Sequence, residues 1–282
     1  GVPFSAKNLF DVAGITTRAG SKINRDNPPA ERDATLVARM EAAGAVLVGA
    51  VNMGEYAYDF TGENVHDGAS RNPHDLDHMT GGSSGGSGAS VASGLVPISL
   101  ASDTNGSIRV PASLCGLFGL KPTYARLSRA RTFPFVGSLD HLGPLARSVT
   151  DLALAYDALQ GYDDGDPVQL RRPQEATASR LKHPIPGIRI AVADGYFTGD
   201  TDAQAHVRHV AQALEVTRTV TIPDAQAARA AAFLITMAEG AALHLDRLRA
   251  RPEDFDPETR DRLLAGAMLP AVWIEKAQKL RR

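Results

Sequence analysis

Apolar and polar residues alternate along the chain with two periods, and together they predict short helices and strands that follow one another. Residues 33–43 (DATLVARMEAA) place three apolar residues at helical spacing behind Asp33 as the N-cap, with Gly44 as the stop. The run at 45–51 (AVLVGAV) is continuously apolar and predicts a buried strand. This first stretch therefore predicts a helix followed by a strand.

The same alternation continues to residue 223. Strands are predicted at 95–101, 117–122, 187–193 and 217–223. Helices are predicted at 89–93 ending near Gly94, at 107–116, at 150–160 with Thr150 as the cap, and at 202–215. Short helices and strands in alternation are typical of an α/β layered fold with a largely buried sheet.

Beyond residue 224 the sequence is rich in Ala, Leu and Arg, with apolar residues at helical spacing, and it predicts helices throughout. The segment 162–186 is rich in Pro, Asp and Arg and shows no clear period. It is predicted to be a surface connection rather than a linker between independent cores. No repeat of 20–50 residues is found.

Composition narrows the class of protein. With 43% hydrophobic and 22% charged residues and a formal net charge of -2, the chain can bury a substantial core and is not a nucleic-acid binder by bulk charge. No apolar run is long enough to span a membrane and no signal peptide is visible, so we expect no membrane association and a cytoplasmic location. The sequence is also compatible with a leader cleaved before Gly1.

Cysteine and histidine usage points away from metal chemistry. The single cysteine, Cys115, excludes an intrachain disulfide framework and a cysteine-based zinc cluster. It lies in an apolar run, so we expect a buried small residue rather than a nucleophile. None of the eight histidines forms a metal-binding pair. We predict no metal and no cofactor.

Glycine is concentrated in one part of the chain: nine of the 26 glycines lie in residues 81–120. The run at 81–90 (GGSSGGSGAS) could be a flexible linker, a phosphate cradle or a loop of a hydrolytic site. A linker does not fit between a strand-rich half and an apolar run. The phosphate-loop motif is absent, and the dinucleotide pattern fails because Val91 stands where its last glycine should be. The third interpretation is therefore favoured.

A second cluster at 102–116 (SDTNGSIRVPASLCG) supports a hydrolytic site. Ser107 follows a tight Asp-Thr-Asn-Gly turn and opens a predicted helix, which suits a nucleophile. The alternative is an ordinary helix N-cap. The predicted oxyanion hole consists of the backbone N–H groups of Thr104, Asn105, Gly106 and Ser107; one such donor is worth about 10² to 10³ in rate.

A nucleophilic serine needs a base, and two residue types can supply it. One of the eight histidines could complete a Ser/His/Asp site. The alternative is a lysine held neutral by burial. The chain has six lysines, and any of them placed in an apolar or Gly-rich segment is a candidate. Both alternatives stay open at the level of residue types.

Six segments taken together resemble the amidase signature family. They are GVPFSAKNLFDVAG (1–14), TTRAGS (16–21), GGSSGGSGA (81–89), DTNGSIRVPASLCG (103–116), GLKPT (119–123) and SLDHLGPLARS (138–148). The resemblance implies a three-layer α/β/α fold with a central mixed sheet. It also implies amide hydrolysis through an acyl-enzyme by a Ser-cisSer-Lys triad. The matching positions are Ser107 as nucleophile, Ser83 as bridging serine and Lys7 as base.

The resemblance also implies how these residues work together. Neutral Lys7 takes a proton from Ser83, which takes one from Ser107, and burial is the means of lowering the pKa of the lysine. The peptide bond between Gly82 and Ser83 is expected to be cis. We expect the hydroxyl of Ser84 to orient this network. Asp103 and Arg109 either brace the nucleophile turn or contact substrate.

The chain departs from the family pattern at three places, one of which is Ala50 in place of a lysine that is not the base. Lys7-Asn8-Leu9 stands for the usual Lys-Asp-Asn, and Asn105-Gly106-Ser107 stands for Gly-Gly-Ser. Asn tolerates a left-handed backbone, so we expect the oxyanion turn to survive. The family resemblance further implies that residues 1–282 are one domain, incomplete at both ends.

Within the family, the chain resembles enzymes that hydrolyse a small carboxylated amide. This resemblance also implies a small accessory subunit and a homo- or hetero-oligomer. A cationic pocket wall would come from Arg126, Arg129 or Arg131, at least two of which we expect to be solvated; Asp140 and His141 are further pocket candidates. Alternatives within the class are the glutaminase subunit of a tRNA-dependent amidotransferase and a general aliphatic amidase. Alternatives outside it are an inactive scaffold and a phosphate-binding module.

Overall fold

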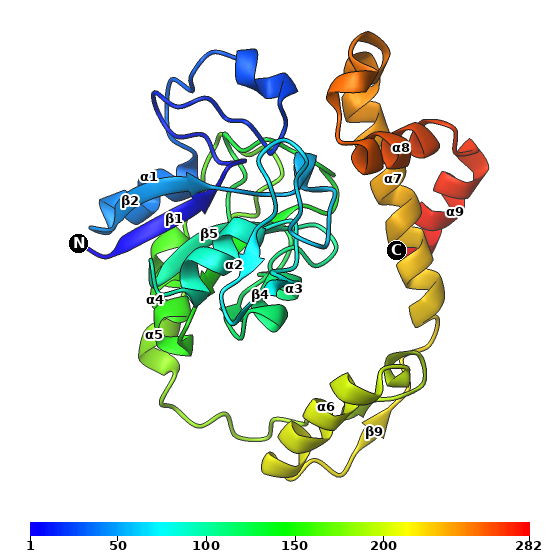
Figure 1. Cartoon of the computed structure of the whole chain (residues 1–282). Coiled ribbons are helices and arrows are strands. Elements are labelled where there is room, and N and C mark those ends of the chain that lie inside the picture. The colour runs from blue at the N-terminus through cyan, green and yellow to red at the C-terminus, as the bar shows by residue number, and fades with distance from the viewer. The chain divides into compact units, whose positions relative to one another are not determined.

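The computed structural model describes all 282 residues and divides into two units. The first comprises residues 1–181 and 237–268, and the second comprises residues 182–236 and 269–282. The triad candidates all lie in the first unit. Strands β1, β2 and β5 of its five-stranded sheet are labelled in Figure 1.

The sheet of the first unit has the order β2-β1-β5-β7-β6. Strand β1 runs parallel to both β2 and β5, whereas β7 is antiparallel to β5 and β6. The predicted central mixed sheet is therefore confirmed. Its strands are β1 (Pro3–Lys7), β2 (Val46–Val51), β5 (Ile98–Asp103), β6 (Phe118–Gly119) and β7 (His141–Ala146).

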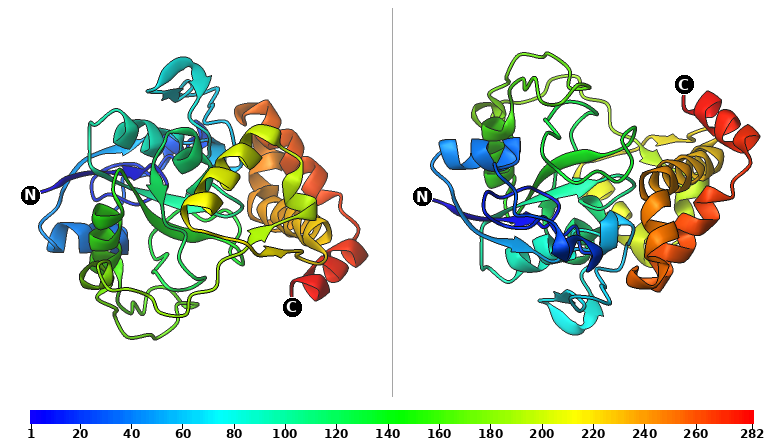
Figure 2. Two further views of the ribbon diagram at one scale, coloured as in Figure 1. Left: turned by 90° about the horizontal axis from the view of Figure 1, so that it is seen from below. Right: turned by 90° about the horizontal axis from the view of Figure 1, so that it is seen from above.

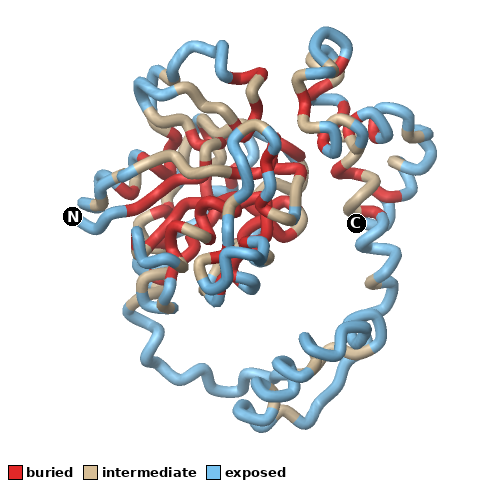
Figure 3. The backbone as a smooth tube through the Cα atoms, in the orientation of Figure 1, coloured by how far each residue is buried: buried red, intermediate tan, exposed pale blue.

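Helices cover both faces of this sheet, which confirms the three-layer α/β/α architecture. Helices α2 (Gly85–Ala92) and α3 (Arg109–Leu114) lie on one face, and α1 (Thr35–Ala42) and α4 (Val149–Leu159) lie on the other (Figure 2). Burial is continuous along β5 and along β1 after its exposed first residue, Pro3 (Figure 3). A cluster beneath α2 and α3 consists of Val91, Val96, Ala101, Ile108, Ala112 and Leu145.

The Gly/Ser-rich run is largely helical rather than a loop, because α2 begins at Gly85. The sequence placed this helix four residues later. Its glycines permit a close backbone approach: a Cβ added at Gly86 would lie 2.5 Å from the backbone nitrogen of Asn52. Tertiary contact, rather than helix propensity, explains this helix of small residues.

Two predicted helix caps are wrong. Helix α1 follows Ala34 without a side-chain cap, because the carboxylate of Asp33 instead accepts from the backbone nitrogen of Ala13 at 2.7 Å. Helix α4 is capped by Ser148, two residues before the predicted Thr150, and its Oγ accepts from the backbone nitrogen of Asp151 at 3.0 Å.

Several predicted strands are shorter or more exposed than the pattern suggested. Strand β2 lies at the edge of the sheet and is only half-buried, although its sequence is continuously apolar. Of the strands predicted at 117–122, 187–193 and 217–223, only two residues each are paired: β6, β8 (Val192–Ala193) and β9 (Thr219–Val220). An apolar run alone does not supply a pairing partner.

The rest of the chain is mainly helical, as predicted from residue 224 onward. Helices α7 and α8 lie side by side, and a Cβ at Gly266 would clash with the carbonyl oxygen of Met237 (Figure 2). In the second unit, β8 and β9 pair in parallel and are connected through α6. The remaining elements are β3 (Arg71–Asn72), β4 (Asp75–Met79), α5 (Thr177–Arg180), α6 (Thr201–Ala213), α7 (Ala225–Ala250), α8 (Pro257–Ala267) and α9 (Ala271–Arg281). None of the helices combines the length and apolarity required to cross a membrane.

Candidate active site

Lys7 is the last residue of β1 and is completely buried. Its Nζ lies 2.7 Å from Ser83 Oγ and 2.9 Å from the Oγ atoms of both Ser84 and Ser102. Burial lowers the pKa of Lys7 to about 7, and the more distant carboxylates oppose this shift only in part. A large fraction of this amine is therefore neutral near pH 7.

Ser83 follows a cis peptide bond from Gly82, as the family resemblance implies. The backbone nitrogen of Gly54 donates to the carbonyl oxygen of Ser83 at 3.1 Å. The neighbouring Ser84 donates its hydroxyl to the carbonyl oxygen of Ser102 at 3.2 Å. These contacts fix both serines on the amine of Lys7.

Ser102 is the contact that sequence reasoning missed. It is the penultimate residue of β5, immediately before the nucleophile turn. Parallel pairing sets Ala6 of β1 opposite Leu100 of β5, which brings the ends of the two strands together. A serine at the end of a buried strand, beside the turn, is only a weak sequence signal for a contact with Lys7. The register of β1 against β5 is what brings Ser102 to that lysine.

The turn proposed from the sequence to carry the nucleophile connects β5 to α3, and Ser107 in it is 3% exposed. Oδ2 of Asp103 accepts from the backbone nitrogens of Ile108 at 3.1 Å and Arg109 at 3.3 Å. The guanidinium of Arg109 also donates to both carboxylate oxygens, at 3.0 and 2.9 Å. Burial alone would raise the pKa of Asp103, but the hydrogen bonds and charge of Arg109 outweigh it and lower this pKa. Asp103 and Arg109 therefore brace the turn.

Within this turn the residue with positive φ is Gly106, at 144°, and not Asn105. Ser107 is not a helix N-cap, because α3 begins at Arg109 and no side chain caps it. The structure brings Lys7 onto Ser83 but shows no hydrogen bond between Ser83 and Ser107.

A cavity of about 250 Å³ adjoins this cluster, with Ser102 and Thr104 in its wall. Asp140 also lines it, and its carboxylate accepts from Thr104 Oγ1 at 2.6 Å and from the backbone nitrogens of Phe135 and Val136. Burial raises the pKa of Asp140. The cavity is thus joined to the amine of Lys7 through the hydroxyl of Ser102.

The three candidate arginines are held by the protein, and the expected solvation of two of them is wrong. Arg129 and Arg131 line the cavity, but they also donate to the carbonyl oxygens of Gly137 and Asp33, each at 2.6 Å. Arg126 is buried away from the cavity and donates to the hydroxyl of Tyr156 at 2.9 Å.

Histidine and cysteine do not contribute to this cluster. His141 does not line the cavity, and its Nδ1 lies 2.6 Å from the carbonyl oxygen of Leu139. No histidine is hydrogen-bonded to the serines around Lys7, which favours the lysine alternative. Cys115 is buried, and burial raises its pKa to about 11. The structure contains no cluster of His, Cys, Asp and Glu arranged to hold a metal ion.

A mixed sheet with a buried lysine among serine hydroxyls and a cis-bonded serine is the arrangement expected of the amidase signature class. The chain belongs to the Amidase family, which it matches over residues 1–281. It is 56% identical to the AtzE subunit of 1-carboxybiuret hydrolase from Pseudomonas sp. (strain ADP) over 284 residues, covering 100% of this chain and 62% of that protein. It is also 37% identical over 313 residues to a glutamyl-tRNA(Gln) amidotransferase subunit of Pseudomonas fluorescens (strain Pf0-1), covering 100% of this chain and 64% of that protein.

Solved structures give the same result. One structure, described as an unexpected vestigial protein complex that reveals the evolutionary origins of an s-triazine catabolic enzyme, matches with a TM-score of 0.98 and 56% identity, over 100% of this chain and 62% of that chain. The corresponding glutamyl-tRNA(Gln) amidotransferase subunit of Thermotoga maritima matches with a TM-score of 0.85 and 33% identity, over 100% and 63%. The chain thus spans less than two thirds of these relatives.

Proposed function

We propose that this protein is an amide hydrolase whose nucleophile is Ser107, with Ser83 as the bridging serine and Lys7 as the base. The observation that carries the proposal is the buried amine of Lys7, which touches three serine hydroxyls and has its pKa lowered to about 7 by burial. Family membership supports the same assignment.

In the proposed acylation, Ser107 Oγ bonds to the carbonyl carbon of the substrate. Its proton passes to Ser83 Oγ while the proton of Ser83 passes to the neutral Nζ of Lys7. The relay then runs backward and protonates the leaving nitrogen as the C–N bond breaks. Water next adds to the Ser107 ester through the same relay and releases the acid.

The developing oxyanion would be received by backbone N–H groups of Thr104 to Ser107. The brace by Asp103 and Arg109 supports this proposal, because it fixes the turn at the start of α3. Asp140 also holds this turn, because its carboxylate accepts a hydrogen bond from Thr104 Oγ1.

For the substrate, we propose 1-carboxybiuret or a similar small carboxylated amide, in a step of cyanuric acid degradation. Support comes from the 56% identity to AtzE and from a cavity of about 250 Å³ whose wall includes Arg129 and Arg131. Glutamine and simple aliphatic amides are the alternative substrates, and the 37% identity to an amidotransferase subunit favours glutamine among them.

We further propose a small accessory subunit, within a homo- or hetero-oligomer in the cytoplasm. The relative described as part of a vestigial complex supports the subunit. That residues 1–282 are one domain stays a prediction.

The test uses the full-length protein with 1-carboxybiuret, glutamine and simple amides assayed side by side, and Ser107→Ala as the inactive control. Selective turnover of glutamine would reject the proposed substrate. A serine-directed fluorophosphonate should label Ser107. If the folded protein is not labelled, an inactive scaffold or a phosphate-binding module is favoured instead.

A further inference from the structure

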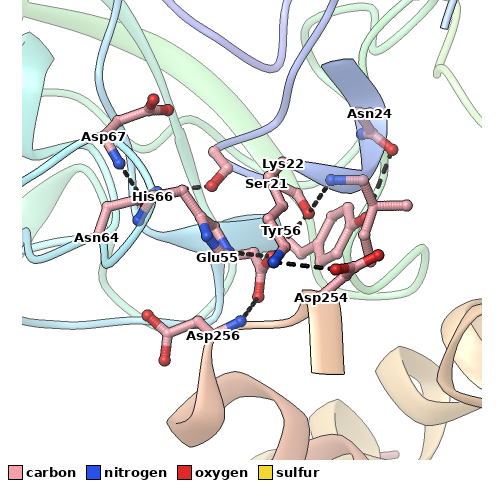
Figure 4. A network of polar contacts seen from close by, with 12 residues as sticks. Ser21, Lys22, Asn24, Glu55, Tyr56, Asn64, His66, Asp67, Asp254 and Asp256 are labelled. Carbon is pink, nitrogen blue, oxygen red and sulfur yellow. Dashed lines mark hydrogen bonds and ion pairs between the residues drawn. The ribbon is translucent and has the colours of Figure 1, made fainter. Parts of the chain in front are cut away.

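Glu55 is a buried carboxylate outside the cluster around Lys7, and three donors from three distant segments converge on it (Figure 4). Its Oε1 accepts from Ser21 Oγ at 2.7 Å and lies 3.0 Å from Nε2 of His66. Its Oε2 accepts from the backbone nitrogen of Asp256 at 2.8 Å. A carboxylate with this many partners is a fixed point in the structure.

The backbone that leaves Glu55 is strained. Tyr56 and Ala57 have φ values of 50° and 63°, so two consecutive non-glycine residues lie in the left-handed region. Such backbone persists only where its surroundings over-determine it. Glu55, which directly precedes these residues, supplies such a constraint.

The same segment cradles the bridging serine through its backbone. Gly54 donates to the carbonyl oxygen of Ser83 at 3.1 Å. In the other direction, the backbone nitrogen of Gly82 donates to the carbonyl oxygen of Phe60 at 2.8 Å, and that of Gly81 donates to the carbonyl oxygen of Thr61 at 3.1 Å. Residues 54–62 therefore hold residues 81–83 at three points, and one of these points adjoins Glu55.

We propose that Glu55 is a positioning residue for the hydrolytic reaction: by anchoring residues 54–62 to Ser21, His66 and Asp256, it fixes Ser83 on the amine of Lys7. This inference rests on the proposed function for its catalytic consequence, but its structural part stands on contacts alone. Glu55 touches neither Lys7 nor Ser83, so it acts through the backbone hydrogen bonds between residues 54–62 and residues 81–83.

The decisive variant is Glu55→Gln, because an amide can accept at one end only and turns a donor toward whichever partner faces its other end. We expect hydrogen–deuterium exchange at the amides of Gly81 and Gly82 to become at least about tenfold faster. Exchange at Ser93, whose backbone nitrogen donates to the carbonyl oxygen of Ala89 in α2 at 3.0 Å, should not change. Glu41→Gln, an exposed position on α1, is the matched control and should behave as the native protein.

The role in turnover is read from kinetics on the full-length protein. We expect Glu55→Gln to lower kcat at least about tenfold and to change KM less, since Ala57 is the one residue of the anchored segment 54–62 that lines the cavity. His66→Gln keeps a donor toward Glu55 and should retain most of kcat, whereas His66→Leu removes the donor and should lower it. If Glu55→Gln does not fold, Ser21→Ala, which removes one donor of three, takes its place.

The two proposals fail in different ways. If exchange in Glu55→Gln is unchanged at Gly81 and Gly82 and faster only near Asp256, Glu55 stabilises the segment around Asp256 and does not position Ser83. That result would overturn the proposal. Equal kcat loss in both His66 variants would also count against it. If the native protein is neither labelled nor active, the proposed hydrolysis is refuted. The exchange measurement still decides whether Glu55 holds residues 54–62 against residues 81–83.

Discussion

The base assignment predicts that acylation titrates with Lys7. Its pKa is lowered from 10.5 to about 7 by complete burial. At pH 7 about half of the Lys7 side chains are neutral, whereas roughly 1 in 3,000 would be neutral at the usual lysine pKa. The shift in pKa corresponds to a free energy of about 5 kcal/mol. Burial on β1 therefore supplies most of the neutral base that the reaction needs.

The assay is the rate of fluorophosphonate labelling at Ser107, measured at pH values on both sides of 7. We expect the rate to rise about tenfold per pH unit below the pKa and to level off above it, because only the neutral amine accepts a proton. Lys7→Met should lower the plateau rate by about 10² to 10⁴. A flat profile, or a Lys7→Met variant that labels at the native rate, would refute the reasoning.

The lowered pKa of Lys7 should also make the free energy of unfolding depend on pH. Between about pH 7 and 10.5 the unfolded chain binds a proton that folded Lys7 lacks. The free energy of unfolding should therefore rise with pH across this window by about 1.4 kcal/mol per unit, and the contribution is lost as the pH falls to 7. Denaturant titrations of the native protein and Lys7→Met should show this slope as their difference. Parallel curves would contradict the lowered pKa.

Two further variants test the surroundings of the site. Asp103→Asn removes the largest of the charges that raise the pKa of Lys7, so the midpoint of the labelling profile should move to lower pH. The hydrogen bonds from the turn to residue 103 also become weaker, which should lower the free energy of unfolding by about 2 to 4 kcal/mol. An unchanged midpoint would contradict the electrostatic interaction between Asp103 and Lys7. Gly143→Ala places a Cβ against the carbonyl oxygen of Leu120 and should lower the free energy of unfolding by about 1 to 3 kcal/mol. Gly49→Ala is the control, because a Cβ at Gly49 has no atom within 4 Å. Equal melting temperatures of the two variants would contradict the packing argument.

Local sequence was sufficient for features that depend on neighbouring residues. The two Gly/Ser-rich segments indicated a hydrolytic site with Ser107 as a candidate nucleophile, because close backbone approach and tight turns require contiguous small residues. Ser83 and Lys7 were indicated by the family resemblance. The alternation of short apolar elements likewise predicted the layered α/β fold. The cap at Asp33 failed because its carboxylate accepts from the backbone nitrogen of Ala13, and the cap at Thr150 failed because α4 begins earlier, behind Ser148.

What the sequence by itself determined is the class of fold and the residue types of the site. Only the tertiary structure decided how those residues are coupled. The register of β1 against β5 brings Ser102 to Lys7, and the convergence of Ser21, His66 and Asp256 fixes Glu55. These partners are 34, 11 and 201 residues from Glu55 along the chain. The physical reason is that burial and hydrogen bonding depend on distance in space, so long-range partners leave no periodic signal in the sequence.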